Sequence, residues 1–395
     1  MPTRPLQVLA TLFLLAYVVV PVAAQEATAE VDQAEASFWS QFRDPDDGML
    51  DMSQYLLENL IGFMPIPIII TEPAVDGGLG LAGVFFHPPN DDQMKPDAEQ
   101  NMILPNMSVA AAAYTGNESW FAGAGHFRNW SKDRYRYGVM GGYANINLDW
   151  YGSDDFPLPN DGIRFNVEGA MLDQDFMFRF ANSRWFLGAG WRYLNSDVTF
   201  KTNLPINLPT VESTVSGISA IGLYENLDSR LSPRKGFKTE LKATANNDAI
   251  GSDFDYEQFS WQLRQYFEIG EKFTLSWRLD GATTSGDVPF YLAPSIQIQG
   301  IPALRYQGET AATAEIRGGY DVRPRWTVLG FVGAGRTADS ISDLSSATTR
   351  SSYGVGFRYL LAKVLGMRVG IDVARGPEGT YFYLVMGSAW NTSGF

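Results

Sequence analysis

The chain has 395 residues, of which 45% are hydrophobic, 13% aromatic and only 19% charged, and its formal net charge at pH 7 is -14. A chain this acidic lacks the clustered basic residues that neutralise nucleic-acid phosphates, so we expect no nucleic-acid partner. It has no cysteine and two histidines, His87 and His126, which excludes disulfides and thiolate metal sites and leaves little for a zinc site or a triad. We therefore expect no metal and no cofactor.

The amino-terminal residues have the pattern of a secretory signal peptide. A charged start at Arg4 precedes an apolar stretch over residues 6–22, and small residues lead up to Ala24. We predict cleavage after Ala24, which makes residues 1–24 the signal peptide. A membrane anchor is the rival interpretation, but Pro21 and the small residues after it favour cleavage.

Residues 25–64 are polar, and we expect them to form a short periplasmic segment ahead of the main domain. Residues 51–60 predict one short amphipathic helix, because apolar side chains recur there at helical spacing. They are Met52, Tyr55, Leu56 and Leu60.

Four aspartates just before this helix raise the question of a calcium site. They are Asp44, Asp46, Asp47 and Asp51, grouped around Gly48. Hard cations prefer several carboxylate oxygens on a tight turn, but the spacing does not match a helical-hand calcium loop. We interpret the group as a solvated acidic turn that caps the helix.

The remainder, residues 65–395, predicts a transmembrane antiparallel β-barrel. No apolar run after the signal reaches the ~18 residues of a spanning helix, whereas 39 glycines and many aromatic residues accompany alternating segments. The predicted strands are Pro65–Thr71, Leu79–His87, Met107–Gly116, Trp120–Trp130, Tyr135–Tyr151, Ile163–Phe180, Arg184–Phe200, Ser213–Asn226, Phe237–Asn247, Phe254–Ile269, Phe273–Thr284, Thr310–Val322, Trp326–Thr337, Ser351–Leu361, Met367–Arg375 and Tyr381–Trp390. About sixteen strands result, with the short turns in the periplasm and the long loops outside.

The last predicted strand carries apolar or aromatic residues at alternate positions, namely Phe382, Leu384, Met386 and, after Gly387, Trp390. This pattern suits a strand with one face in lipid and an aromatic ring at the membrane interface. We interpret these residues as the carboxy-terminal assembly signal of an outer-membrane barrel. A half-buried strand of a soluble sandwich would look the same in isolation, so the interpretation depends on the other strands.

Several ordered motifs in the last part of the chain resemble the BamA/TamA family of bacterial surface antigen barrels. They are Tyr224–Phe237 with Asp228, Pro233 and Gly236, then Tyr353–Tyr359, Arg368–Ala374 and Gly387–Trp390. The resemblance runs from Pro65 to Trp390. It implies a sixteen-stranded barrel in the bacterial outer membrane whose sixth outer loop folds back into the lumen.

In that family the sixth loop presents a Val-Arg-Gly-Phe/Tyr motif to an acidic residue of the inner wall. The loop corresponds here to residues 287–309, and the tetrapeptide to Ile298, Gln299, Gly300 and Ile301. The glycine is kept and the arginine is replaced. The family's wall motif, Phe-x-Asp-x-Gly, has Gly333 in place of its aspartate. Both members of the charge pair are therefore absent.

A substitute pair is available near the same place. Arg305 lies in the loop, next to Tyr306, and Glu315 lies on the strand that follows. We predict that Arg305 reaches into the lumen and pairs with Glu315, because an unpaired ion in a confined lumen costs several kcal/mol. A solvated Arg305 is the alternative.

Three classes of function stay open. The leading hypothesis is a BamA/TamA-type barrel in outer-membrane assembly or transport, without POTRA modules, since the roughly forty residues before Pro65 are fewer than the ~50 of an ordinary domain. A passive pore for small solutes is the alternative. We expect no enzyme, because no Gly-x-Ser-x-Gly elbow is present and no serine can be matched to a histidine from sequence. The expected partners are outer-membrane lipid, the barrel assembly machinery during insertion, and other outer-membrane or periplasmic proteins.

Overall fold

The structure is a computed structural model that describes residues 42–58, 62–87, 106–152, 158, 162–181, 183–201 and 210–390. The predicted signal peptide lies outside these residues, as does Leu60 of the predicted helix. The rest of that helix is present as α3, Ser53–Glu58. No helix in the described part of the chain is long and apolar enough to cross a membrane.

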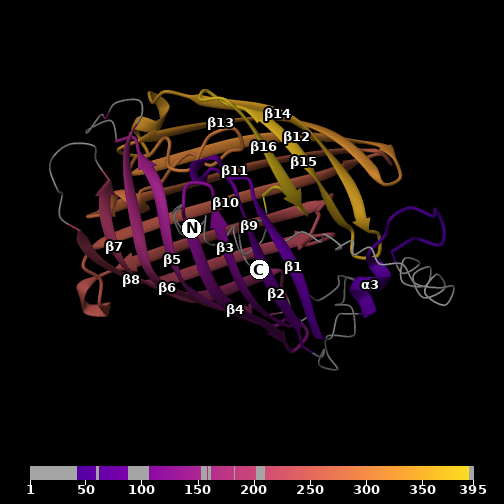
Figure 1. The fold of residues 1–395 in the computed structure, drawn as a ribbon, viewed down its shortest axis with the longest axis horizontal. Coiled ribbons are helices and arrows are strands. Elements are labelled where there is room, and N and C mark those ends of the chain that lie inside the picture. The colour runs from indigo at the N-terminus through magenta and orange to yellow at the C-terminus, as the bar shows by residue number, and fades with distance from the viewer. Residues whose placement is uncertain are drawn as a thin grey trace, which may run out of the picture.

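Sixteen strands form one antiparallel sheet in which every strand pairs with the next along the chain. Figure 1 shows this sheet as a wall that curves round from indigo β1 to yellow β16. The strands are β1 Gly62–Ile70, β2 Gly78–Phe86, β3 Met107–Thr115, β4 Trp120–Trp130, β5 Tyr135–Trp150, β6 Ile163–Arg179, β7 Trp185–Lys201, β8 Val211–Leu227, β9 Gly236–Asn246, β10 Tyr256–Ile269, β11 Phe273–Gly286, β12 Thr310–Arg323, β13 Trp326–Ala338, β14 Arg350–Ala362, β15 Met367–Arg375 and β16 Thr380–Met386. The predicted all-β barrel of about sixteen strands is confirmed.

The alternation of side chains explains why these segments form a barrel wall. On β3, Ala111 and Ala113 are buried while Ala110, Ala112 and Tyr114 are exposed. The same two-residue period puts large apolar side chains on the outside of many strands. They include Leu79, Trp120, Ile218, Val332, Val355 and Phe382. An outer face of this kind suits contact with lipid.

The connections differ at the two ends of the barrel, as the sequence predicted. Short turns join β4 to β5, β6 to β7, β10 to β11, β12 to β13 and β14 to β15, all at one end. The long connection of residues 287–309 lies at the other end. By the usual arrangement of such barrels the end with short turns faces the periplasm. The connection between β2 and β3 includes residues 88–105, which lie outside the described part of the chain.

The sheet has two free edges, because its order runs from β1 to β16 and no ladder joins these two strands within the described residues. β1 pairs with β2 in continuous register from Gly62 to Ile70 although it contains Pro65 and Pro67. Proline has no N–H and is tolerated at a sheet edge when the missing donor faces away from the paired neighbour. We infer that both missing donors lie on the free edge of β1. That edge is therefore poor in donors for a ladder with β16, and we call the place where β1 and β16 meet the seam.

Candidate functional site

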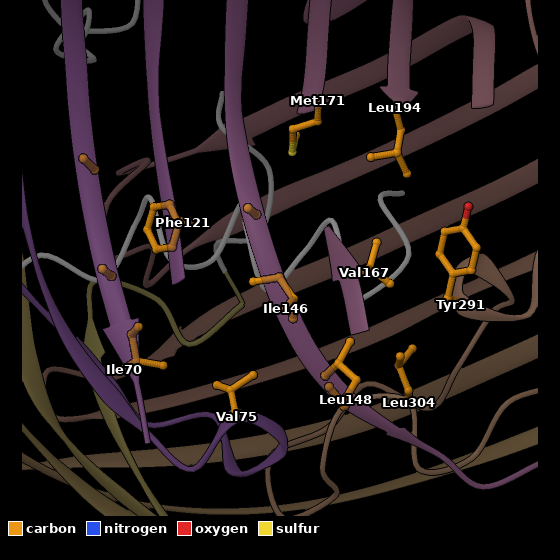
Figure 2. Packing of buried hydrophobic residues seen from close by; sticks show 14 of the residues in the cluster. Ile70, Val75, Phe121, Ile146, Leu148, Val167, Met171, Leu194, Tyr291 and Leu304 are labelled. Atoms are coloured by element: carbon orange, nitrogen blue, oxygen red, sulfur yellow. The ribbon is translucent and has the colours of Figure 1, made fainter. Parts of the chain in front are cut away.

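Residues 287–309 lie inside the barrel and are called the lumenal loop. Their 3-10 turn, Phe290–Leu292, places Tyr291 and Leu292 at 2% and 3% exposure. These side chains and Leu304 belong to one apolar cluster with residues from β1 to β8. Figure 2 shows Tyr291 and Leu304 within this cluster, together with Leu148 and Val167 of the wall. The predicted lumenal loop is present, and part of the lumen is filled with apolar side chains.

Gly300, the residue kept from the family motif, is held by geometry that only glycine suits. Its φ is +95°, and a Cβ there would lie 3.1 Å from the backbone nitrogen of Gly376 in the β15–β16 turn. Its own N–H donates to the hydroxyl of Tyr383 on β16, at 2.9 Å. Left-handed φ and close backbone approach both favour glycine. The motif glycine thus lets the lumenal loop touch the last strand directly.

Gln299, in the position of the family's arginine, also contacts the wall. Its side-chain oxygen accepts a hydrogen bond from Arg317 Nη2 on β12, at 2.9 Å. The charge is therefore on the wall and the neutral partner on the loop. Gly333, in place of the family's aspartate, lies where a Cβ would be 3.3 Å from Ile298 of the loop. In place of the charge pair that the family resemblance implies, the structure has a hydrogen bond of opposite polarity between Arg317 and Gln299, and little room for a side chain at position 333 beside Ile298.

The predicted pair between Arg305 and Glu315 is wrong. Glu315 is 2% exposed and pairs with Arg278, at 3.1 Å, and Arg317, at 2.9 Å. Arg278 lies directly opposite Glu315 in the β11–β12 ladder, and Arg317 is two residues along the same face of β12. These wall cations reach the carboxylate without crossing the lumen, so no cation is needed from the loop.

Arg305 instead lies at the β15–β16 turn. Its Nε is 3.3 Å from a carboxylate oxygen of Glu378, and its guanidinium stacks on Tyr151 at 4.0 Å from the ring centroid. The hydroxyl of Tyr306 donates to the same carboxylate. Arg305 and Tyr306 therefore fasten the loop to the turn that precedes β16.

The lumenal loop also contacts the other side of the seam. The N–H of Ala303 donates to the carboxylate of Glu72, in the connection between β1 and β2, at 2.9 Å. Gly300 and Arg305 hold the β16 side through Tyr383 and Glu378. The loop thus bridges the seam from inside the barrel, near the end with long loops.

The carboxy-terminal residues do not follow the predicted path. β16 ends at Met386, Gly387 has a φ of +72°, and the chain turns inward. Trp390 is 2% exposed and donates from Nε1 to Glu315, at 2.9 Å. The prediction of an interfacial ring at Trp390 is wrong, because the left-handed Gly387 ends the strand and a buried carboxylate accepts the indole N–H. Phe382, at 60% exposure, does face outward from β16, as predicted.

Glu315 and Arg317 therefore form the centre of a buried cluster that we call the wall cluster, together with Arg278, Arg358 and Asp372. Asp372 is fully buried and pairs with Arg317, at 2.9 Å, and Arg358, at 2.6 Å. The cluster contacts the loop through Gln299 and the tail through Trp390. Sequence reasoning missed Arg278, Arg317, Arg358 and Asp372. The sequence signal that could have identified them is a charged residue at a strand position where the alternation predicts an inward side chain.

The predicted solvated acidic turn is present only in part: Asp46 and Asp47 are exposed, whereas the other two aspartates are buried. Asp44 and Asp51 are 6% and 5% exposed, and together with Asp47 they surround Arg325 of the β12–β13 turn, whose side chain is 2% exposed. Lys363 of the β14–β15 turn pairs with Asp44 at 3.1 Å. The expected capping is present, since Asp51 accepts the N–H of Ser53 at the start of α3.

This contact fixes the segment 42–58 on the carboxy-terminal side of the seam, and we call it the clasp. The N–H of Met52 donates to Leu361, at 2.7 Å, and the N–H of Val364 donates to Ser53. Burial alone would raise the pKa of Asp51, but hydrogen bonds from Ser53 and Arg325 outweigh it and hold the pKa below its usual value. Because α3 ends at Glu58 and β1 begins at Gly62, the clasp bridges the seam at the periplasmic end.

The motif at residues 224–237 is explained by a second ionic network. Asp228 accepts N–H groups of its own turn, including those of Arg234 and Lys235. Arg230 pairs with Glu225 and with Asp133 of the β4–β5 turn, each at 2.7 Å. Burial would raise the pKa of Asp133, but Arg136 and Arg230 outweigh it and lower the pKa to about 2. The motif therefore ties two periplasmic turns together.

Comparison with known proteins bears on the fold. No protein-family model matches the sequence, and no curated protein matches it. The solved structure of BamA from Haemophilus ducreyi lacking POTRA domains 1–3 is similar over 83% of this chain and 70% of its own, with a TM-score of 0.55 and 13% identity. The chain is an outer-membrane barrel. CdiB from Acinetobacter baumannii is similar over 82% of this chain and 59% of its own, with a TM-score of 0.51 and 7% identity. At these identities the likeness concerns the fold of the barrel and does not extend to its activity.

Proposed function

We propose that this outer-membrane barrel is of the BamA/TamA type and acts in outer-membrane assembly or transport by opening its seam. The observation that carries the proposal is a seam that has no ladder between the residues described by the structure and that the lumenal loop and the clasp bridge. The lumenal loop bridges it from inside through Glu72 and Tyr383. The clasp bridges it at the periplasmic end through Arg325. The partners proposed are outer-membrane lipid, the barrel assembly machinery during insertion, and client proteins; no catalytic step or cofactor is assigned.

The chemistry of the β1 edge supports this role. An unpaired strand edge offers main-chain groups to which another strand can be added. Pro65 and Pro67 weaken pairing with β16 without weakening the ladder to β2. An edge that pairs poorly with its own last strand stays available to an incoming strand, or opens to let a lipid-soluble group pass.

The clasp sets a limit on how far the seam opens while it is docked. Only three residues, 59–61, connect the last residue of α3 to the first residue of β1. An extended chain spans at most ~3.3–3.6 Å per residue, so this connection reaches no further than roughly 14 Å. Wide opening therefore requires the clasp to leave Arg325.

A passive pore is the second candidate, and the interior of the barrel supports it less well. Pores of this class have a polar, water-filled lumen. Here Tyr291, Leu292 and Leu304 of the lumenal loop are packed against apolar wall residues. In planar bilayers the proposal predicts brief, infrequent openings, whereas steady conductance of the unmodified protein would favour the pore.

A cross-linking experiment tests the proposal. The chain has no cysteine, so cysteines at Ile69 on β1 and Phe382 on β16 can be joined by cleavable thiol reagents of graded length. Short linkers should abolish rescue of the outer-membrane defects of a strain that lacks the gene, and cleavage should restore rescue. The matched control joins Phe382 to its ladder partner Val373 on β15, which leaves the seam free. Full rescue by the protein with its seam locked would refute the proposal.

A further inference from the structure

Both histidines of the chain meet at one serine on the outside of the barrel. His87 Nε2 lies 2.8 Å from Ser108 Oγ, and His126 Nδ1 lies 2.9 Å from the same oxygen. The two rings are 5.3 Å apart in an edge-on arrangement. The three residues come from three neighbouring strands, since His87 follows β2, Ser108 is on β3 and His126 is its ladder partner on β4. The arrangement was not predicted from sequence.

The strand alternation places this group on the outer face. Exposed Leu79, Leu81 and Phe85 share the parity of His87 on β2, and exposed Tyr114 shares that of Ser108 on β3. All three polar side chains are half-buried. Polar groups facing hydrocarbon are costly, but they are accommodated where the bilayer becomes polar.

The position along the strands corresponds to that boundary. β3 begins at Met107, opposite Phe127, whereas β4 continues to Trp130. Three further residues extend β4 by roughly 10 Å towards the periplasm. Trp130 stacks on Tyr135 at 5.6 Å, as expected of an interfacial aromatic belt. The histidines therefore lie at a step of the barrel rim, where β2 and β3 end while β4 continues towards the periplasm.

The free ring nitrogens give the group its binding capacity. His87 Nδ1 and His126 Nε2 form no hydrogen bond within the described residues. The serine hydroxyl donates to one ring and accepts an N–H from the other. In the neutral state one outward nitrogen is therefore an N–H donor and the other an acceptor. Uptake of one proton makes both outward nitrogens donors and gives the pair a positive charge.

Arg128 completes the site. It lies two residues beyond His126 on the same face of β4, is exposed, and has its guanidinium 5.7 Å from the ring centroid of Trp130. It forms no ion pair with the residues that the structure describes. The ladder partners of His126 and Arg128 on β5 are Val139 and Tyr137, which are uncharged. The charged and titratable groups of this face are thus His87, His126, Arg128 and Tyr137, with no described carboxylate paired to the first three.

We propose that His87, Ser108, His126 and Arg128 bind a phosphate group, carried by a phospholipid headgroup of the periplasmic leaflet or free in solution. A phosphate accepts the two imidazole N–H groups and the guanidinium N–H groups in charge-assisted hydrogen bonds. It favours the protonated histidine pair, in which both outward nitrogens are donors. Such a site fixes a lipid beside β1 and the seam.

The test uses the two histidines as reporters. Protein labelled with ¹⁵N-histidine and purified without a histidine tag gives two sets of imidazole signals, both from the site. In a phosphate-free detergent it is titrated with dihexanoylphosphatidylglycerol, with inorganic phosphate, and with dihexanoylglycerol, which has the chains but no phosphate. We expect both imidazole signals to shift with the phospholipid and not to respond to dihexanoylglycerol.

Variants separate the contributions. Arg128→Gln and Ser108→Ala should each weaken phospholipid binding about tenfold or more, whereas Arg164→Gln, an exposed arginine paired with Asp149 at the other end of the barrel, should not. If inorganic phosphate saturates the site at the same concentration as the phospholipid, the phosphate site is retained and its ligand is free phosphate. Equal shifts with dihexanoylglycerol, or no shift with either phosphate, would overturn the proposal. So would covalent labelling of Ser108 by a fluorophosphonate, which would make the serine a nucleophile. None of these results depends on whether the seam opens.

Discussion

Arg325→Gln should release the clasp while the barrel stays folded. The substitution removes the cation between Asp44, Asp47 and Asp51. Breaking a buried ion pair costs about 3–5 kcal/mol. We take the lower end, about 3 kcal/mol, because the side chain of Asp47 is 35% exposed and Lys363 remains next to Asp44. At about 1.4 kcal/mol per factor of ten, the docked state loses roughly 150-fold in population relative to the released state.

Hydrogen exchange measures this change directly. The N–H of Met52 donates to Leu361 and the N–H of Val364 donates to Ser53, and both bonds exist only while the clasp is docked. The protection of these two N–H groups should fall by roughly two orders of magnitude in Arg325→Gln, and the amides of β6 to β8 should be unchanged. The matched control is Arg164→Gln, whose pair with Asp149 is half-exposed and is worth under about 1 kcal/mol. If protection at Met52 and Val364 falls less than threefold, the ion pairs do not hold the clasp.

Three further predictions concern the loop, the tail and pH. Gly300→Ala should detach the loop from the β15–β16 turn and raise protease sensitivity there, because its φ is +95° and the new Cβ meets Gly376; unchanged cleavage would contradict the contact. Trp390→Phe keeps an aromatic ring but removes the N–H that donates to Glu315. It should lower the free energy of unfolding, measured by denaturant titration, by about 1–3 kcal/mol. An unchanged free energy would contradict the buried hydrogen bond. Because the pKa of Asp51 is lowered, its contribution to the clasp is complete above the ordinary value of 3.8 and is lost as the pH falls below it. Protection factors, which correct for the slower intrinsic exchange at lower pH, should therefore be equal at pH 5.5 and pH 7, and a fall at pH 5.5 would contradict this.

The barrel could be predicted from sequence because a strand pattern is local. Alternation of apolar and polar residues over a short segment predicts each strand, and the turn residues between the segments predict where each strand ends. Even β1, which contains Pro65 and Pro67, could be predicted, because a bacterial barrel of this kind has an even number of strands and one more was needed. The bounds of β16 were wrong because a left-handed Gly387 ends it before Trp390, and an alternating pattern carries no sign of that conformation.

The pairing of charges could not be predicted, because it depends on register and on residues far apart in the chain. Glu315 pairs with Arg278 because the β11–β12 ladder sets them opposite each other. Asp44 pairs with Arg325, which is 281 residues away. Composition showed an acidic turn but not its partner. The lumenal position of the loop followed from the family resemblance, while its contacts with Glu72 and Tyr383 required the structure.

Pulsed electron paramagnetic resonance across the seam shows whether the seam opens. Spin labels at the exposed positions Leu81 on β2 and Val373 on β15 report the width of the seam in outer-membrane vesicles. We predict a short and a longer distance in the unmodified protein, because the seam is closed in some molecules and open in others. In a variant with both Pro65→Ala and Pro67→Ala we predict a shift to the short one, because two regained N–H donors add about 1–3 kcal/mol to closure. A single narrow distance in both proteins would contradict a seam that opens.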